Sequence, residues 1–133
     1  MIIDIKTGIE NRVIREVTRD DTASALGYEH MPVLATSRIV AFMEYVSLSS
    51  VQEYLPKGYT TVGSYINLHH TKPAVPGDKL SCFSKLTEVK GRKLTFEITL
   101  SNDIEKIAHA SHVRVIINQS VFERLINKND VNR

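Results

Sequence analysis

One segment limits the folds open to this chain of 133 residues more than any other, an apolar helix in its first half. Between Ile39 and Val46 the residues are Ile-Val-Ala-Phe-Met-Glu-Tyr-Val, so apolar side chains occupy most of a helical circumference. A surface helix carries a single apolar stripe, so we expect this helix to be enclosed by other elements. It is predicted over 36–54, because Thr36 or Ser37 stands where an N-cap belongs and a proline and a glycine follow its end.

After this helix the apolar residues alternate with a period of two, which is typical of strands. The sequences Pro76-Gly77-Asp78, Lys90-Gly91-Arg92 and Asn102-Asp103 stand between successive runs and predict short turns. We therefore expect consecutive strands to pair in an antiparallel sheet. The predicted strands are 12–18, 60–70, 79–89, 93–102 and 106–118, with a short helix at 20–26 and a terminal helix at 120–127.

This order of elements predicts an α+β fold in which a strongly curved antiparallel sheet wraps around one long central helix. By analogy of fold alone, that arrangement is the hotdog architecture. We expect residues 1–133 to form a single domain of this kind. The edges of such a sheet need protection, so we also expect a symmetric homodimer that joins two sheets.

Composition excludes several classes of function. Lysine and arginine number 17 against 15 aspartates and glutamates, a net charge of +2 that gives no reason to expect nucleic-acid binding. The longest apolar run has only five residues (39–43), which is too short to span a membrane. The first residues lack the order of a signal peptide, so we expect a cytoplasmic protein. The single cysteine, Cys82, excludes an internal disulfide and a cysteine-rich metal site, and we expect neither a metal nor a cofactor.

Glu44 lies in the middle of the apolar helix, where a carboxylate without a partner would be costly to bury. Either it reaches solvent, a dimer interface or a backbone group, or it acts as a positioned base that orients water. Thr36 is most simply an N-cap, but its place at the helix start would also suit an oxyanion, because unpaired N–H groups gather there. The two residues are about 12 Å apart along a helix, so they do not bond directly.

Histidines and small residues supply further candidates. His69 and His70 are adjacent in a strand and point to opposite faces, so one is either a core histidine or a general acid or base, and the pair does not hold one metal. Gly63 indicates a bulge or a close approach to a ligand. Arg114 is either an outward charge or a contact for an anionic ligand. Less informative residues are His109 and His112 (structural or surface), Cys82 (core), and the basic hairpin Lys90, Arg92 and Lys93 (a solvated turn or an attractor for phosphates).

Three segments, VLATSRIVAFMEYVS, VGSYINLHHTKPAVPGDKL and AHASHVRVII, resemble the fluoroacetyl-CoA thioesterase group of hotdog proteins over about 13–122. The resemblance implies hydrolysis of an acyl-CoA thioester to the free acid and CoA. It also implies a catalytic set of Thr36, Glu44 and His70, with Gly63 and Arg114 in the substrate site. In one mechanism Thr36 is the nucleophile or hydroxyl donor, and Glu44 and His70 act as base and proton carrier that activate Thr36 or water. An acyl-enzyme and direct attack by water both remain open.

One segment departs from that family. The family covers its acyl pocket with a lid that bears a phenylalanine, whereas residues 23–31 read ASALGYEHM and contain none. We therefore expect another acyl group as substrate. Two alternatives share the fold: a non-catalytic module that binds or senses acyl-CoA, and an enoyl-CoA hydratase. The hydratase is less favoured, because its chemistry requires an Asp/His pair where this helix offers Glu and Thr.

Overall fold

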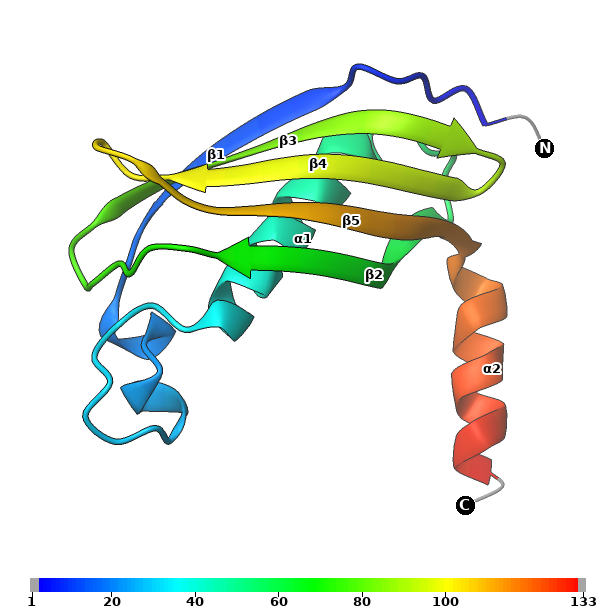
Figure 1. Ribbon diagram of the computed structural model, residues 1–133. Coiled ribbons are helices and arrows are strands. Elements are labelled where there is room, and N and C mark those ends of the chain that lie inside the picture. Colours follow the sequence, from blue (N-terminus) through cyan, green and yellow to red (C-terminus); the bar gives the residue numbers. More distant parts are fainter. Residues whose placement is uncertain (1–2, 132–133) are drawn as a thin grey trace.

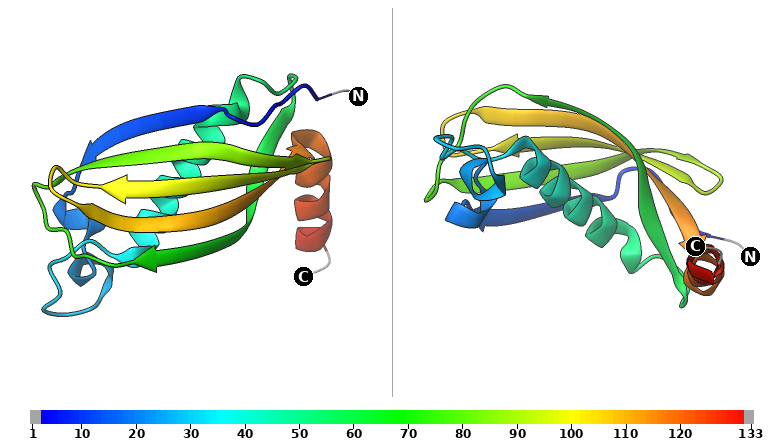
Figure 2. Two further views of the ribbon diagram at one scale, coloured as in Figure 1. Left: turned by 45° about the horizontal axis from the view of Figure 1, so that its top comes forward. Right: turned by 90° about the horizontal axis from the view of Figure 1, so that it is seen from below.

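The computed structural model describes residues 3–131, with side chains described as far as residue 128. Helix α1 (Thr36–Gln52) lies against the inner face of a curved five-stranded sheet (Figures 1 and 2). The prediction of a long helix held by a curved antiparallel sheet is confirmed. The helix begins at Thr36 as predicted, and its last turn stops two residues before the predicted end at Tyr54.

The five strands are β1 (Glu10–Glu16), β2 (Tyr59–His70), β3 (Lys79–Lys90), β4 (Lys93–Ser101) and β5 (Lys106–Asn118). All neighbouring strands are antiparallel, in the order β1-β3-β4-β5-β2. The prediction that β2 and β3 pair through the turn at Pro76 is therefore wrong. Strand β2 lies at an edge beside β5, and the turn instead bonds to the chain beyond β1, through Gly77 N to Val17 O at 2.9 Å. A period of two fixes the faces of a strand but not its partner.

The core lies between α1 and the sheet. One side of the helix is buried through Ile39, Phe42, Met43, Val46 and Val51. The opposite side is open within this chain, where Tyr45 remains 47% exposed, so the predicted enclosure of the helix is only partial. The sheet covers the face it touches and leaves the rest of the apolar circumference free.

Two smaller regions complete the fold. The predicted helix at 20–26 is two short 3₁₀ turns, η1 (Arg19–Asp21) and η2 (Ser24–Leu26), which precede the start of α1. The terminal helix is confirmed as α2 (Gln119–Val131), and it projects from the end of β5 away from the sheet (Figure 1). Within the described residues, no helix has the length and apolar character needed to cross a membrane.

Candidate active site

A threonine and a histidine meet where α1 begins. Thr36 is the first helical residue rather than the N-cap, because the extended residue before it, Ala35, occupies the cap position. The expectation that Thr36 caps the helix is therefore wrong. Its hydroxyl lies 2.9 Å from Nδ1 of His70, the last residue of β2. A helix start and a strand end thus join two side chains that are 34 residues apart in the sequence.

Of the two adjacent histidines, His70 is the one that faces the helix. His69 points away and stacks on His109 of β5, with ring centroids 4.8 Å apart. The other ring nitrogen of His70, Nε2, is buried and has no hydrogen-bond partner among the described residues. A buried imidazole nitrogen without a partner is costly in a folded protein, and such groups often have a functional explanation. The imidazole therefore has one nitrogen on the Thr36 hydroxyl and one that is buried without a partner among the described residues.

Glu44 does not contact that pair among the described residues; it lies about two turns further along α1 and faces Arg114 of β5. Its Oε2 is 3.4 Å from Nη1 of Arg114, a loose ion pair in which the glutamate side chain is 41% exposed and the arginine side chain 6%. Glu44 thus obtains both a charged partner and access to solvent. The two clusters are separate sets of contacts, but each joins α1 to β2, through His70 in one and Gly63 in the other.

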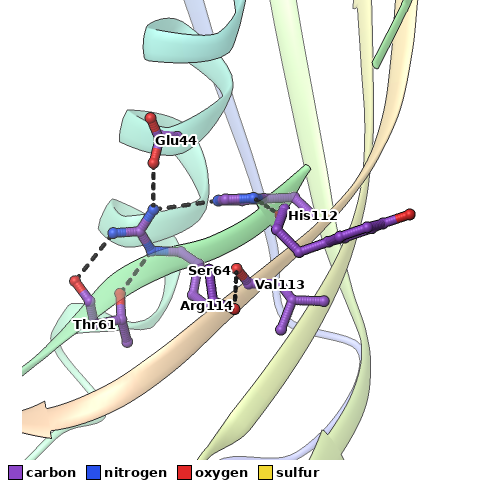
Figure 3. A network of polar contacts seen from close by, with 7 residues as sticks. Glu44, Thr61, Ser64, His112, Val113 and Arg114 are labelled. Atoms are coloured by element: carbon purple, nitrogen blue, oxygen red, sulfur yellow. Dashed lines mark hydrogen bonds and ion pairs between the residues drawn. The ribbon is translucent and has the colours of Figure 1, made fainter. Parts of the chain in front are cut away.

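Arg114 is held on three sides inside the protein (Figure 3). Its Nε donates to Oγ1 of Thr61 at 2.8 Å, and its Nη2 donates to the carbonyl oxygen of Thr61 at 3.0 Å. Its Nη1 lies 3.2 Å from Nε2 of His112 as well as facing Glu44. The interpretation of Arg114 as an outward charge is wrong: His112 and Arg114 point inward, while the valines between and beyond them are less buried.

Burial sets the electrostatics of this network. Desolvation lowers the pKa of Arg114 from its ordinary value, and the neighbouring Glu44 carboxylate raises it in part; an arginine remains charged in any case. Desolvation also lowers the pKa of His112; the hydrogen bond to the Tyr65 carbonyl and Glu44 raise it, and Arg114 lowers it further. A charged guanidinium therefore lies beside an imidazole that burial keeps neutral.

Of the two interpretations of Gly63, the bulge is confirmed. The pairing of β2 with β5 shifts between Gly63 and Tyr65, which is the mark of a bulge. A Cβ on Gly63 would lie 2.5 Å from Oε2 of Glu44 and 3.3 Å from Cε1 of His112. The missing side chain therefore makes room for the glutamate carboxylate.

Sequence reasoning missed two members of the network, Thr61 and His112. His112 is almost completely buried and contacts Arg114, although the sequence interpretation placed it among structural or surface residues. The alternation His112-x-Arg114 within an apolar strand is the signal that would have found it, since residues two apart share a face. By contrast, the basic hairpin is exposed, and its Lys90 pairs with Glu88 at 3.7 Å.

A recess next to Thr36 offers space for an apolar group. It has a volume of about 340 Å³ and lies between η2, the loop that follows, and the first turn of α1. The large side chains Leu26, Tyr28 and Met31 line it and are exposed. Exposed apolar side chains that surround a polar group are typical of a small-molecule site.

Comparison with known proteins supports a family assignment. The family described as "fluoroacetyl-CoA-specific thioesterase" matches residues 17–120. A fluoroacetyl-CoA thioesterase from Streptantibioticus cattleyicolor is 26% identical over 100 residues, which cover 75% of this chain and 72% of that protein.

Solved structures show the same fold. A solved structure of a fluoroacetyl-CoA thioesterase superposes with a TM-score of 0.89 at 23% identity, covering 94% of this chain and 97% of that one. A thioesterase superfamily member of Thermus thermophilus gives 0.90 at 24% identity, over 98% and 97% of the two chains. A hot-dog-like protein from Thermanaerovibrio acidaminovorans gives 0.86 at 20% identity, over 92% and 91%. The predicted hotdog fold is confirmed.

Proposed function

Because the chain belongs to the fluoroacetyl-CoA-specific thioesterase family and is an acyl-CoA thioester hydrolase, we propose that its chemistry takes place where Thr36 meets His70. The observation that carries this proposal is the 2.9 Å contact between the Thr36 hydroxyl and His70 Nδ1 at the start of α1. A hydroxyl and an imidazole in hydrogen-bond contact are the parts needed for a nucleophile and its base. The free N–H groups of the first helical turn lie beside them and suit a developing oxyanion.

The proposed reaction adds an oxygen to the thioester carbonyl and expels CoA. The attacking oxygen is either the Thr36 hydroxyl or a water molecule that takes the place of this hydroxyl beside His70. The proton of the attacking oxygen passes to the imidazole. The carbon–sulfur bond then breaks, and the departing thiolate takes that proton. Where Thr36 attacks, a second round with water releases the acid and restores the hydroxyl. Glu44, which is half-exposed and paired with Arg114, is assigned the role of orienting water.

We assign the acyl group to the recess beside Thr36. Leu26, Tyr28 and Met31 would surround it with apolar surface, and the volume of about 340 Å³ exceeds what a two-carbon acyl group fills. The substrate class proposed is therefore an acyl-CoA with an apolar acyl chain longer or bulkier than fluoroacetyl. Arg114 and Gly63 contribute to the substrate site indirectly, since both shape the position of Glu44.

The proposal further includes a homodimer and a cytoplasmic setting, with all of the activity in one domain formed by residues 1–133. Strand β2 is twelve residues long and lies at an edge of the sheet, so one side of its backbone is available to a second copy. Sedimentation of the purified protein tests the dimer; a monomer at micromolar concentration would contradict it.

Release of free thiol from a panel of short, branched, aromatic and long acyl-CoAs tests the function. Cys82 does not interfere with a thiol reagent, because it is buried and burial raises its thiol pKa to about 12. We expect Thr36→Ala, Glu44→Gln and His70→Ala each to slow release strongly while the fold persists. The matched control is His109→Ala, which removes an exposed histidine from the outer face of the sheet. Tight binding of acyl-CoA without hydrolysis would indicate a binding module, and unchanged turnover in all three variants would overturn the site.

A further inference from the structure

The proton on His112 can be placed from its neighbours. An arginine side chain only donates hydrogen bonds, so the contact of 3.2 Å between Arg114 Nη1 and His112 Nε2 requires Nε2 to accept. The other ring nitrogen, Nδ1, lies 2.8 Å from the carbonyl oxygen of Tyr65 and must donate to it. Both contacts are satisfied only by a neutral imidazole protonated at Nδ1. The bulge in β2 thus places a carbonyl that selects the tautomer.

This tautomer matters for Glu44, because Nη1 of Arg114 contacts both His112 and the Glu44 carboxylate. Nη1 of Arg114 has two hydrogens, one directed to His112 and one to Glu44. Thr61 holds the other edge of the guanidinium through Nε and Nη2. Without an acceptor at His112, the guanidinium could rotate about the side that is hydrogen-bonded to Thr61, and Nη1 would move. The ion pair between Nη1 and Glu44 would then lose its fixed geometry.

We propose that His112 is a positioning residue for thioester hydrolysis, acting through Arg114 to hold the Glu44 carboxylate in place. The proposal rests on the role proposed for Glu44. His112 needs no contact with substrate for this role. His112 supplies a neutral hydrogen-bond acceptor, Nε2, at a fixed position. Only the tautomer protonated at Nδ1 provides this acceptor.

The surroundings of His112 are consistent with that role on every side. The charged groups that bear on it are Arg114 from its own strand and Glu44 from α1. Strand β2 contributes the Tyr65 carbonyl, and β4 contributes the ring of Phe96, whose centroid is 6.3 Å away. A charged imidazole would set its Nε2 proton against a hydrogen of the Arg114 guanidinium, so the network in Figure 3 exists only while His112 is neutral.

Two amide substitutions separate positioning from packing. His112→Gln can present an oxygen near the place of Nε2, whereas His112→Asn can replace only the shorter Nδ1 side of the ring. We expect His112→Asn to lower kcat on the order of tenfold with little change in KM, since misplacing a catalytic group slows the chemical step. We expect His112→Gln to retain most of the wild-type kcat. His109→Gln, an exposed histidine in the same strand, is the control and should behave as wild type.

The outcomes distinguish this inference from the proposed function. If Glu44→Gln lowers turnover but the Asn and Gln variants at His112 fall equally, in step with their melting temperatures, His112 is only structural and the inference is wrong. If Glu44→Gln is as active as wild type, the role of Glu44 fails and the inference fails with it. Nitrogen-15 spectra of the imidazole give a readout independent of activity: Nδ1 protonated and Nε2 bare supports the proposal, and the opposite tautomer overturns it.

Discussion

The two polar clusters between α1 and β2 are built in opposite ways. At Thr36 and His70 there is a single hydrogen bond, an exposed hydroxyl, and a buried ring nitrogen without a partner among the described residues. Around Arg114 the three guanidinium nitrogens all have partners, and the side chain is 6% exposed. The first cluster has unused hydrogen-bonding capacity at a helix start, and the second has almost none.

The two clusters therefore suit different tasks in a small enzyme. A fully satisfied buried network is rigid, and a rigid group is suited to hold a neighbouring carboxylate in place. A pair with unused hydrogen-bonding capacity is suited to exchange a proton with substrate, because other groups of the protein do not already occupy its donors and acceptors. We therefore expect variants of the pair to change rate more than stability, and variants of the network to change stability as well as rate.

The largest effect is expected for Thr36→Val, which removes the hydroxyl but keeps a branched side chain of the same shape. Turnover of the preferred acyl-CoA should fall about 10³-fold, because a positioned nucleophile or proton-transfer partner is lost. The free energy of unfolding should change by less than about 0.5 kcal/mol, since the side chain is exposed and does not cap the helix. Thr36→Ser, which restores a hydroxyl, is the control. A loss of stability as large as the loss in rate would show that the pair is part of the structural framework.

Next in size is Arg114→Leu, which tests the opposite half of the comparison. The substitution leaves Thr61 and His112 without their shared partner in a buried site, so we expect a loss of about 3 kcal/mol in the free energy of unfolding. Urea denaturation followed by circular dichroism measures it. Arg124→Leu, on the exposed surface of α2, should change the same quantity by less than about 0.5 kcal/mol. Equal effects at the two arginines would mean that the network adds no stability.

A smaller effect is expected for Gly63→Ala, which tests whether the network positions Glu44. The new methyl would lie 2.5 Å from Oε2 of Glu44, and because that carboxylate ends a flexible side chain, it can move aside. We expect turnover to fall about tenfold while unfolding changes by about 1 kcal/mol or less. In a Glu44→Gln background the same substitution should add little further loss of rate. Additive losses in rate would show that Gly63 acts on something other than Glu44.

The comparison also explains which parts of the fold could be predicted. Helix α1, the strands of the sheet and the terminal helix can be predicted from the periodicity of neighbouring apolar residues. The pairing of β2 with β5 does not, because strand partners depend on contacts between distant segments. The turn at Pro76 is a real turn, yet it connects strands that never pair, so turn chemistry alone suggested the wrong neighbours.

The same limit applied to the candidate site. Thr36, Glu44, Gly63, His70 and Arg114 were found from residue type, spacing and resemblance. The inward direction of Arg114 was missed, because a charge in an apolar strand is ordinarily assigned to the solvent face. Thr61 was missed because its role exists only relative to the guanidinium, and no local pattern records a partner that lies 53 residues away. His112 was missed together with the inward direction of Arg114, since residues two apart in a strand share a face.

The smallest expected effect is a dependence of stability on pH that arises from His112 in the network. Burial, the largest cause, lowers the pKa of His112 in the folded protein below its ordinary value near about 6.5. The unfolded chain therefore binds more protons between the two pKa values, and the stability that neutral His112 contributes is lost as the pH falls from the unfolded pKa through the folded one. Urea denaturation between neutral and mildly acidic pH should show wild type losing stability faster than His112→Gln, which cannot titrate. Parallel curves for wild type and His112→Gln would show that the imidazole is not held neutral by the network.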